Sequence, residues 1–474
     1  MKSAVYRQLV PNPAKHKRTE SDHSFFLAQT MIRAEAVSGL RVRRTRPGLR
    51  SPSLISSYRG SMSRLLFSFP PYALATPSFS AAYRSLIGAL RPGTRFVVAC
   101  RESDQAAIEQ WFTDGGHAAD DIEWAYLPDF VSFTDWAEDA YVGLVDAEDG
   151  QHYLMEPWEF LRAGDALIAD AVEEHTADIK ASQAPLMFQG GNCLVGDSHW
   201  FLGRDYYFDC IDLISQPRAP VRRPDAMPME DFVDSLFKEY LDSSRELVLL
   251  GSERPIPLPP MIGAAEAGRY YLDLPTGGNG SYQPIFHIDM LMSLIGDNGQ
   301  GFQVMVGDPT LADSMLGRQS PYALAGEYKR IADQLSALGF EVHRNPLVHW
   351  PTERNTLTLG QLEQIGRTDN DVVLLNACDE LRQLGATDES DVTVREWHHI
   401  TWNNCLVENS AQHGKHVYLP TFGYGDKAAL QSIDQHMKAL WEGHGYTVHM
   451  LGDFNAFAER AGVVHCISKY IGRS

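Results

Sequence analysis

The sequence has no run of eighteen apolar residues, so no segment of it is predicted to cross a membrane as a helix. Residues 1–10 show no apolar core ahead of a cleavage site and so give no indication of a secretory signal. The six cysteines are scattered, with neither a CxxC pair nor a spacing typical of a zinc site. In a chain of 474 residues this pattern predicts reduced thiols and a cytoplasmic protein.

Basic side chains are scarce in most of the chain and concentrated at its beginning. Residues 1–64 hold 13 Lys/Arg against 3 Asp/Glu, which leaves 28 basic and 58 acidic side chains beyond residue 64. An acidic body repels nucleic acid and suits a cationic ligand. We therefore predict a cationic small molecule as the partner, with no nucleic acid and no membrane. Whether the chain forms a homo-oligomer stays open.

The composition divides the chain at about residue 61. Residues 1–61 are rich in Arg and Ser and show no sustained periodicity, so they cannot bury enough apolar surface to order themselves. We predict a basic, disordered arm or a translated leader there, and a targeting peptide is the alternative. Residues 62–474 are predicted to form a single domain.

Beyond Leu65, short β-rich runs alternate with helical patterns, as is typical of an α/β fold. Residues 95–100 predict a strand and residues 103–112 a helix. The clearest unit is a strand at 417–420 followed by a helix at 426–442. Such units recur at irregular spacing, without a readable sequence repeat.

Three other segments are predicted to be insertions or long loops. They are residues 217–228, 254–275 and 345–357. His398 and His399 are neighbours that cannot share one strand face, so we interpret them as ordinary loop or strand residues and not as metal ligands.

Cys466 stands in a short apolar run that follows the small-residue turn Ala461-Gly462. The run predicts a buried strand at residues 462–468. A thiol in such a strand is either a packed core cysteine or a nucleophile, and a nucleophile needs a base and charged partners from elsewhere in the fold. Taken alone, Cys466 favours the core interpretation.

Four other stretches carry polar residues that the local pattern does not require. They hold Asp139, the amides Gln189 and Asn192 beside two glycines, the pair His287 and Asp289, and Asn404. If residues 286–290 are extended, His287 and Asp289 project from one face of the strand. Adjacent glycines permit a close approach of backbone or ligand. Each stretch also has an ordinary structural interpretation: a cap, a hydrogen-bonded pair, a bulge or a turn.

Together with the run around Cys466, these stretches resemble, in the same order, the motifs of the guanidine-modifying (pentein) superfamily. The resemblance is strongest to its agmatine deiminase and bacterial-type peptidylarginine deiminase branch, which shows W-x-R-D, E/x-G-G-N/D, G-H-x-D-M, S-Y-x-N and G-G-x-x-H-C-x-T. The corresponding residues are Trp136-Ala-Glu-Asp139, Gln189-Gly-Gly-Asn192, Phe286-His-Ile-Asp-Met290, Thr401-Trp-Asn-Asn404 and Gly462-Val-Val-His-Cys-Ile-Ser468. The resemblance covers residues 62–474. It implies a single catalytic domain with a five-fold pseudosymmetric α/β propeller fold and an active site in its central channel.

The resemblance also implies a reaction. The chain would be a hydrolase that acts on a C–N bond of a guanidino substrate (an arginine derivative, agmatine or peptidyl-arginine) and releases ammonia through a covalent thiouronium on Cys466. His287 would serve as acid and base, and Asp139 and Asp289 would hold the planar N–H fork of the guanidinium. The implied substrate-binding residues are Asn404, Gln189, Asn192, Trp136 and Glu138. No metal and no organic cofactor is implied.

Three residues depart from the motifs of this branch. Gln189 stands where the deiminases often have Glu, Glu138 replaces Arg, and Phe286 replaces Gly; the last two predict a bulkier and more acidic rim. Two alternatives therefore stay open. One is an amidinotransferase of the same superfamily, and the other is a catalytically silent relative that binds a cationic ligand. The joint presence of His287, Asp289 and Cys466 argues against the silent relative.

Overall fold

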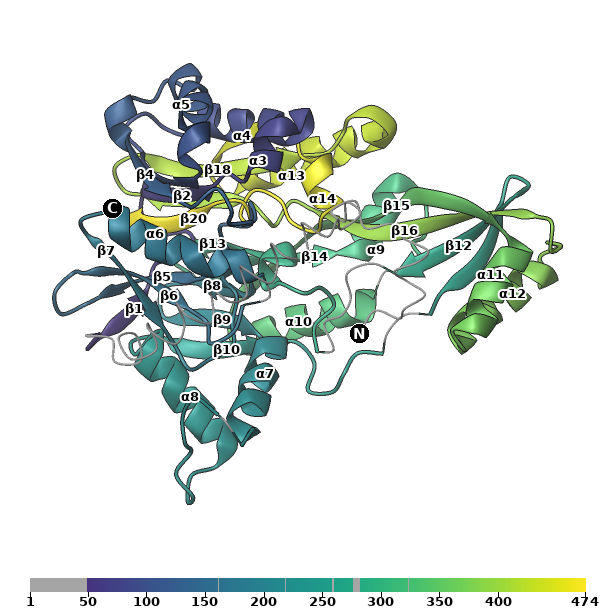
Figure 1. Cartoon of the computed structure of the whole chain (residues 1–474), viewed down its shortest axis with the longest axis horizontal. Helices are drawn as coiled ribbons and strands as arrows, with labels where there is room; N and C mark the ends of the chain where they lie inside the picture. Colours follow the sequence, from purple (N-terminus) through teal and green to yellow (C-terminus); the bar gives the residue numbers. More distant parts are fainter. Residues whose placement is uncertain (1–48, 161, 218, 258–259, 276–281, 323) are drawn as a thin grey trace.

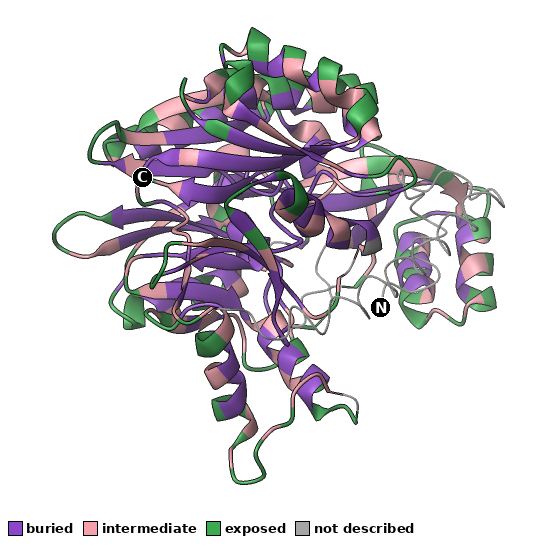
Figure 2. Ribbon diagram, turned by 60° about the vertical axis from the view of Figure 1, so that its left-hand side comes forward, coloured by how far each residue is buried: buried purple, intermediate pink, exposed green. Residues whose placement is uncertain are grey.

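The computed structural model describes residues 49–474 except 161, 218, 258–259, 276–281 and 323. Within these residues the strands form five sheets, of four, three, six, three and four strands. The sheet interiors are buried, and the helices present their exposed faces to the outside (Figure 2). The predicted α/β class is confirmed.

One pairing pattern recurs in all five sheets: two strands pair antiparallel, and the second also pairs in parallel with a third strand. A parallel neighbour needs a long crossover, which here carries helices. The five units are β20 (Lys469–Arg473), β2 (Met62–Ser68), β3 (Arg95–Cys100); β5 (Val142–Asp146), β6 (His152–Glu156), β7 (Ile179–Gln183); β8 (Cys193–Val195), β9 (His199–Gly203), β10 (Glu246–Leu250); β13 (Met292–Asp297), β14 (Phe302–Asp308), β15 (Glu341–Thr358); and β17 (Leu406–Ser410), β18 (Gly414–Thr421), β19 (Thr447–Asp453). The five-fold pseudosymmetry itself stays a prediction.

Helices fill the crossovers and cover the sheets (Figure 1). They are α3 (Pro71–Ala75), α4 (Pro77–Ala89), α6 (Ile168–His175), α7 (Arg204–Ser215), α8 (Met229–Tyr240), α9 (Pro309–Leu316), α10 (Ala325–Ala337) and α13 (Gln431–Gly443). Helix α5 (Gln105–Asp114) leads from β3 to β4 (Ile122–Tyr126), and β4 extends the sheet of β20, β2 and β3. Helix α9 shows how the sequence sets the boundaries: the Asp308 side chain accepts from the Thr310 and Leu311 amides, and Gly317 closes the helix at φ 62°.

Part of the predicted arm belongs to the body of the fold. Strand β1 (Pro52–Leu54) pairs antiparallel with β5, and the Tyr58 side chain is buried against the core. Residues 49–61 are therefore integrated into the domain. Residues 1–48, the rest of the predicted arm, lie outside the described residues.

Two of the segments predicted to be insertions or long loops contain strands. Residues 254–275 include β11 (Ile262–Glu266) and β12 (Arg269–Pro275), and residues 345–357 lie within β15. Strand β15 pairs antiparallel with β16 (Asp391–Thr401), and this ribbon projects from the body with α11 (Leu359–Thr368) and α12 (Val372–Gln383), at the right of Figure 1. For both segments the alternative of a long loop was wrong, because the charges that interrupt the apolar pattern here are paired across strands. Arg395 Nε, for example, lies 2.6 Å from Asp273 Oδ1.

No helix among the described residues combines the length and the apolar character that a membrane crossing requires.

Three buried histidines lie where β15 and β16 pair. His398 and His399 both lie in β16, in agreement with their interpretation as strand residues, and the rings of His349 and His399 are 4.4 Å apart. Burial lowers the pKa of His398 to about 3 and that of His399 to about 4. Burial, with His399 close by, also lowers the pKa of His349. All three imidazoles are therefore neutral in the folded protein near pH 6.

These histidines predict that the protein loses stability in mild acid. The unfolded chain takes up protons near pH 6.5, whereas the folded chain keeps the imidazoles neutral. Their contribution is therefore fully present above pH 6.5 and is lost as the pH falls towards 4. Each histidine should cost about 1.4 kcal/mol of unfolding free energy per pH unit in this window. Urea unfolding between pH 7.5 and 5 should show a shallower pH slope for His399→Leu than for wild type. The exposed His413→Gln variant is the control, and equal slopes for wild type and His399→Leu would contradict the prediction.

Candidate active site

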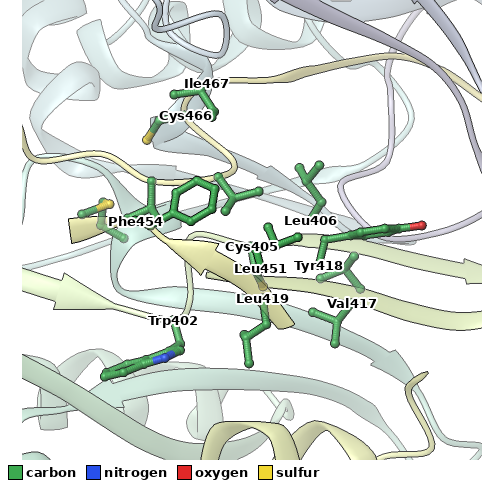
Figure 3. Close-up of a cluster of buried hydrophobic side chains, with 14 of the residues drawn as sticks. Trp402, Cys405, Leu406, Val417, Tyr418, Leu419, Leu451, Phe454, Cys466 and Ile467 are labelled. Carbon is green, nitrogen blue, oxygen red and sulfur yellow. The ribbon is translucent and has the colours of Figure 1, made fainter. Parts of the chain in front are cut away.

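Cys466 lies in a turn at residues 464–467, immediately before β20, and not in the predicted strand at 462–468. The strand prediction was wrong because Asn404 takes up the backbone donors of this segment. Asn404 Oδ1 accepts from the amides of Val463 at 3.1 Å, His465 at 3.0 Å and Cys466 at 3.2 Å. Figure 3 shows Cys466 with Ile467 at the margin of a buried hydrophobic cluster.

The Cys466 sulfur has an amide and a carboxylate as neighbours. Asn404 Nδ2 donates to Sγ at 3.1 Å, and Asp289 Oδ2 lies 3.6 Å from Sγ. Burial, together with the charges of Asp289 and Asp139, raises the pKa of Cys466 well above its usual value, although the Val463 amide and Asn404 oppose this. The sulfur is therefore a protonated thiol while no cation is bound.

Asp289 belongs to the short 3-10 helix η5 (Ile288–Met290), so the extended backbone that would place His287 and Asp289 on one strand face does not continue through residues 286–290. Asn192 causes this turn, because its Oδ1 accepts from the Ile288 amide at 3.0 Å. Burial, with the Asp139 charge adding to it and His287 opposing it, raises the pKa of Asp289 to about 7. Asp289 Oδ2 also lies 2.8 Å from Nδ1 of His465. His465 was not predicted to belong to the site, although it lies next to Cys466 and matches the His of the G-G-x-x-H-C-x-T motif.

His287 is held by an amide and faces a carboxylate. Its Nε2 donates to Gln189 Oε1 at 2.6 Å, which leaves Nδ1 as the nitrogen that can take up a proton. Nδ1 lies 3.6 Å from Asp139 Oδ1. Burial lowers the pKa of His287, and Asp139 and Asp289 oppose this effect. Gln189 therefore fixes the tautomer of a buried, neutral imidazole.

The two adjacent glycines lie in the 3-10 helix η4 (Gly190–Asn192) and not in a strand. A Cβ on Gly191 would lie 2.5 Å from His287 Nδ1 and 3.1 Å from Asp289 Oδ2. A Cβ on Gly190 would lie 2.0 Å from the Glu138 carbonyl oxygen. The predicted close approach is confirmed, because the backbone here touches the side chains of the site.

Asp139 forms an ion pair with Arg162, a residue that was not predicted to belong to the site and for which the sequence offers no signal. Arg162 Nε also lies 3.0 Å from Asp165 Oδ2. Burial lowers the pKa of Arg162, but Asp139 and Asp165 outweigh it and raise the pKa above its usual range. Asp139, Arg162 and Asp165 line a small cleft with Gln189 and Glu159.

Glu138 lies behind the Cys466 turn, in a buried ion pair. Its Oε1 is 2.6 Å from Lys469 Nζ, and its amide donates to the Cys466 carbonyl at 3.1 Å. Burial raises the pKa of Glu138, while Lys469 opposes this effect. The prediction that Glu138 makes the rim more acidic was wrong, because its charge is paired inside the protein. Phe286 packs on the ring of His287 with 4.4 Å between centroids.

Two other predicted substrate-binding residues serve as supports in this structure. Asn192 is fully buried and uses its amide on Ile288, Gln283 and the Gly203 carbonyl. Trp136 packs against the Cys466 turn, because a Cβ on Gly462 would lie 2.3 Å from its ring. Their contacts with a substrate stay predictions.

The fold brings together six of the predicted site residues. They are Cys466, His287, Asp289, Asp139, Asn404 and Gln189. Across the part of the chain that the structure describes, no three His, Cys, Asp or Glu side chains are grouped to hold a metal ion.

The fold is that of the agmatine deiminase structures. A provisionally assigned agmatine deiminase superposes with a TM-score of 0.51 at 16% identity, over 88% of this chain and 95% of its own. The agmatine deiminase of C. jejuni gives a TM-score of 0.51 at 10% identity, over 90% of this chain and 99% of its own. No protein-family model matches the sequence, and no curated protein matches it. The predicted resemblance to the agmatine deiminase branch of the penteins is confirmed in the fold.

Proposed function

We propose that this chain is a hydrolase that cleaves a C–N bond of a guanidino substrate through a covalent intermediate on Cys466. One observation carries the proposal: each of the five site segments lies in the connection between two successive strand units. Asp139 follows β4, Gln189 precedes β8, Asp289 precedes β13, Asn404 lies between β16 and β17, and Cys466 precedes β20. This order also supports the five-fold propeller arrangement, with the site on its central axis.

The chemistry follows from the charges around the thiol. Asp139 and Asp289 offer carboxylates to the N–H fork of a guanidinium, a geometry that suits bidentate pairing. The bound cation offsets the two negative charges that raise the pKa of Cys466, so binding favours the thiolate. The substrate therefore activates its own nucleophile.

The bond changes balance with His287 as the proton carrier. Cys466 Sγ attacks the guanidinium carbon while its proton passes to His287 Nδ1. The C–N bond then breaks, and this proton leaves with the nitrogen as ammonia. Water next attacks the thiouronium carbon, and His287 takes one proton of the water. The C–S bond then breaks, this proton returns to sulfur, the second proton of the water passes to solvent, and the neutral ureido product departs.

The test is ammonia release from arginine, agmatine, an N-acylated arginine and an arginyl peptide. Release from one compound by wild type, but not by Cys466→Ala, supports the proposal and identifies the substrate class. A trapped adduct of wild type without ammonia, seen by mass spectrometry, points to amidino transfer. If wild type gives neither ammonia nor an adduct with any of the compounds, the hydrolase proposal is refuted and a catalytically silent binder is favoured.

A further inference from the structure

Arg162 presents a guanidinium to Asp139, the carboxylate that the proposed function assigns to the substrate. We propose that Arg162 is a specificity-determining residue: it occupies Asp139 in the ligand-free protein, so that only a ligand with a guanidinium displaces it. The inference rests on the proposed function for the role of Asp139. It does not depend on turnover.

The contacts of Arg162 allow such a displacement. Arg162 is held at two points, by Asp139 at its terminal nitrogen and by Asp165 at Nε, 3.0 Å away. Asp165 is itself fixed, because it accepts from the amide and the hydroxyl of Thr134, each at 2.7 Å. Release from Asp139 therefore breaks one ion pair and leaves the other intact. The Arg162 side chain is 32% exposed, so the released nitrogen meets water and the nearby exposed Glu159 in the cleft.

A tethered competitor selects among cations by their geometry. Arg162 is part of the chain, so its effective concentration at Asp139 is high, on the order of millimolar or more. An ammonium is a compact, strongly hydrated point charge that cannot reproduce a planar N–H fork. A guanidinium ligand replaces the lost pair with one of the same kind and also reaches Asp289, whose Oδ1 is buried without a hydrogen-bond partner. Arg162 therefore weakens the binding of both kinds of cation by the same factor, and only the stronger guanidinium ligands still bind at a given concentration.

The experiment compares two ligands that carry one positive charge each, butylguanidine and pentylamine. Both are titrated calorimetrically into Cys466→Ala protein, which binds without turnover, and into Cys466→Ala/Arg162→Ala protein. If Arg162 occupies Asp139 most of the time, its removal should tighten butylguanidine binding roughly ten- to hundredfold. Pentylamine should gain by the same factor, so that its weaker binding becomes measurable. Asp139→Asn should abolish the binding of both ligands.

Two further variants keep the test decisive. Arg162→Lys retains the charge without the fork, so its affinity for butylguanidine should lie between those of the other two proteins; this variant carries the test if Arg162→Ala does not fold. Arg50→Ala is the matched control, because it breaks an exposed pair with Glu148 at 3.3 Å and should change neither affinity. Unchanged or weaker binding of butylguanidine in a folded Arg162→Ala or Arg162→Lys protein overturns the proposal.

The outcomes separate this inference from the proposed function. Tighter guanidine binding without Arg162, in a protein that releases no ammonia from any substrate, supports the specificity role and refutes the hydrolase. Ammonia release by a protein whose ligand affinity does not change when Arg162 is removed supports the hydrolase and refutes the specificity role.

Discussion

Replacement of Asn404 by alanine is expected to lower the free energy of unfolding by about 3 kcal/mol or more and to abolish turnover. Asn404 Oδ1 accepts from three backbone amides of the Cys466 turn, at Val463, His465 and Cys466. All three residues are buried, so their N–H groups cannot turn to water when the acceptor is removed. Urea unfolding and ammonia release measure the two losses.

A second substitution at this position separates the two roles of the amide. Asn404→Asp keeps the oxygen that accepts from the turn but places a negative oxygen, in place of Nδ2, beside the Cys466 sulfur. We expect a folded protein in which the pKa of Cys466 is higher still and turnover is lost. Asn345→Ala is the matched control, because Asn345 is also fully buried but accepts from no backbone amide. An Asn404→Ala protein as stable as Asn345→Ala would contradict the prediction, because it would show that the Cys466 turn does not need the hydrogen bonds to Asn404.

Lys469→Met is expected to cost about 3–5 kcal/mol of unfolding free energy, because it leaves the Glu138 carboxylate buried without its counter-ion. The double variant Glu138→Gln/Lys469→Met should recover most of this loss, since no lone charge then remains inside the protein. Thermal and urea unfolding of the two single variants and the double variant form a complete cycle.

An exposed ion pair provides the control for this cycle. Lys438 and Glu442 pair on the surface of α13, with side chains 35% and 47% exposed. Lys438→Met should cost about 1 kcal/mol or less. If Lys469→Met and the double variant are equally unstable, the loss comes from packing of the lysine side chain and not from the buried charge.

The sequence predicted which side chains lie together better than the backbone that carries them. His287, Asp289 and Cys466 could be selected because their stretches, taken together, resemble the motifs of one superfamily, although each stretch alone has an ordinary structural explanation. Their backbone could not, because the turns at 464–467 and 288–290 form through Asn404 and Asn192, which lie far away along the chain. From the sequence alone, apolar periodicity favours a strand, because it does not show that a distant side chain accepts hydrogen bonds from the backbone amides.

Residues that act through a buried or partly buried ion pair were the hardest to predict. Nothing around Arg162 or Lys469 in the sequence distinguishes them from other basic residues, and only the fold brings them to Asp139 and Glu138. The projecting ribbon of β15 and β16 was missed for the same reason, because Arg395 looks like a surface charge until Asp273 is placed opposite. Regular elements with clear periodicity, such as β3, were predicted with their observed bounds.

The protonated state of Cys466 bears on how the protein survives oxidants. Peroxides react with thiolates, and a buried thiol that two carboxylates keep protonated is a poor target for sulfenic acid formation. The cation that prepares the sulfur for substrate also prepares it for oxidation. We therefore expect peroxide to inactivate the protein while a cationic substrate is bound and to spare it while the site is empty.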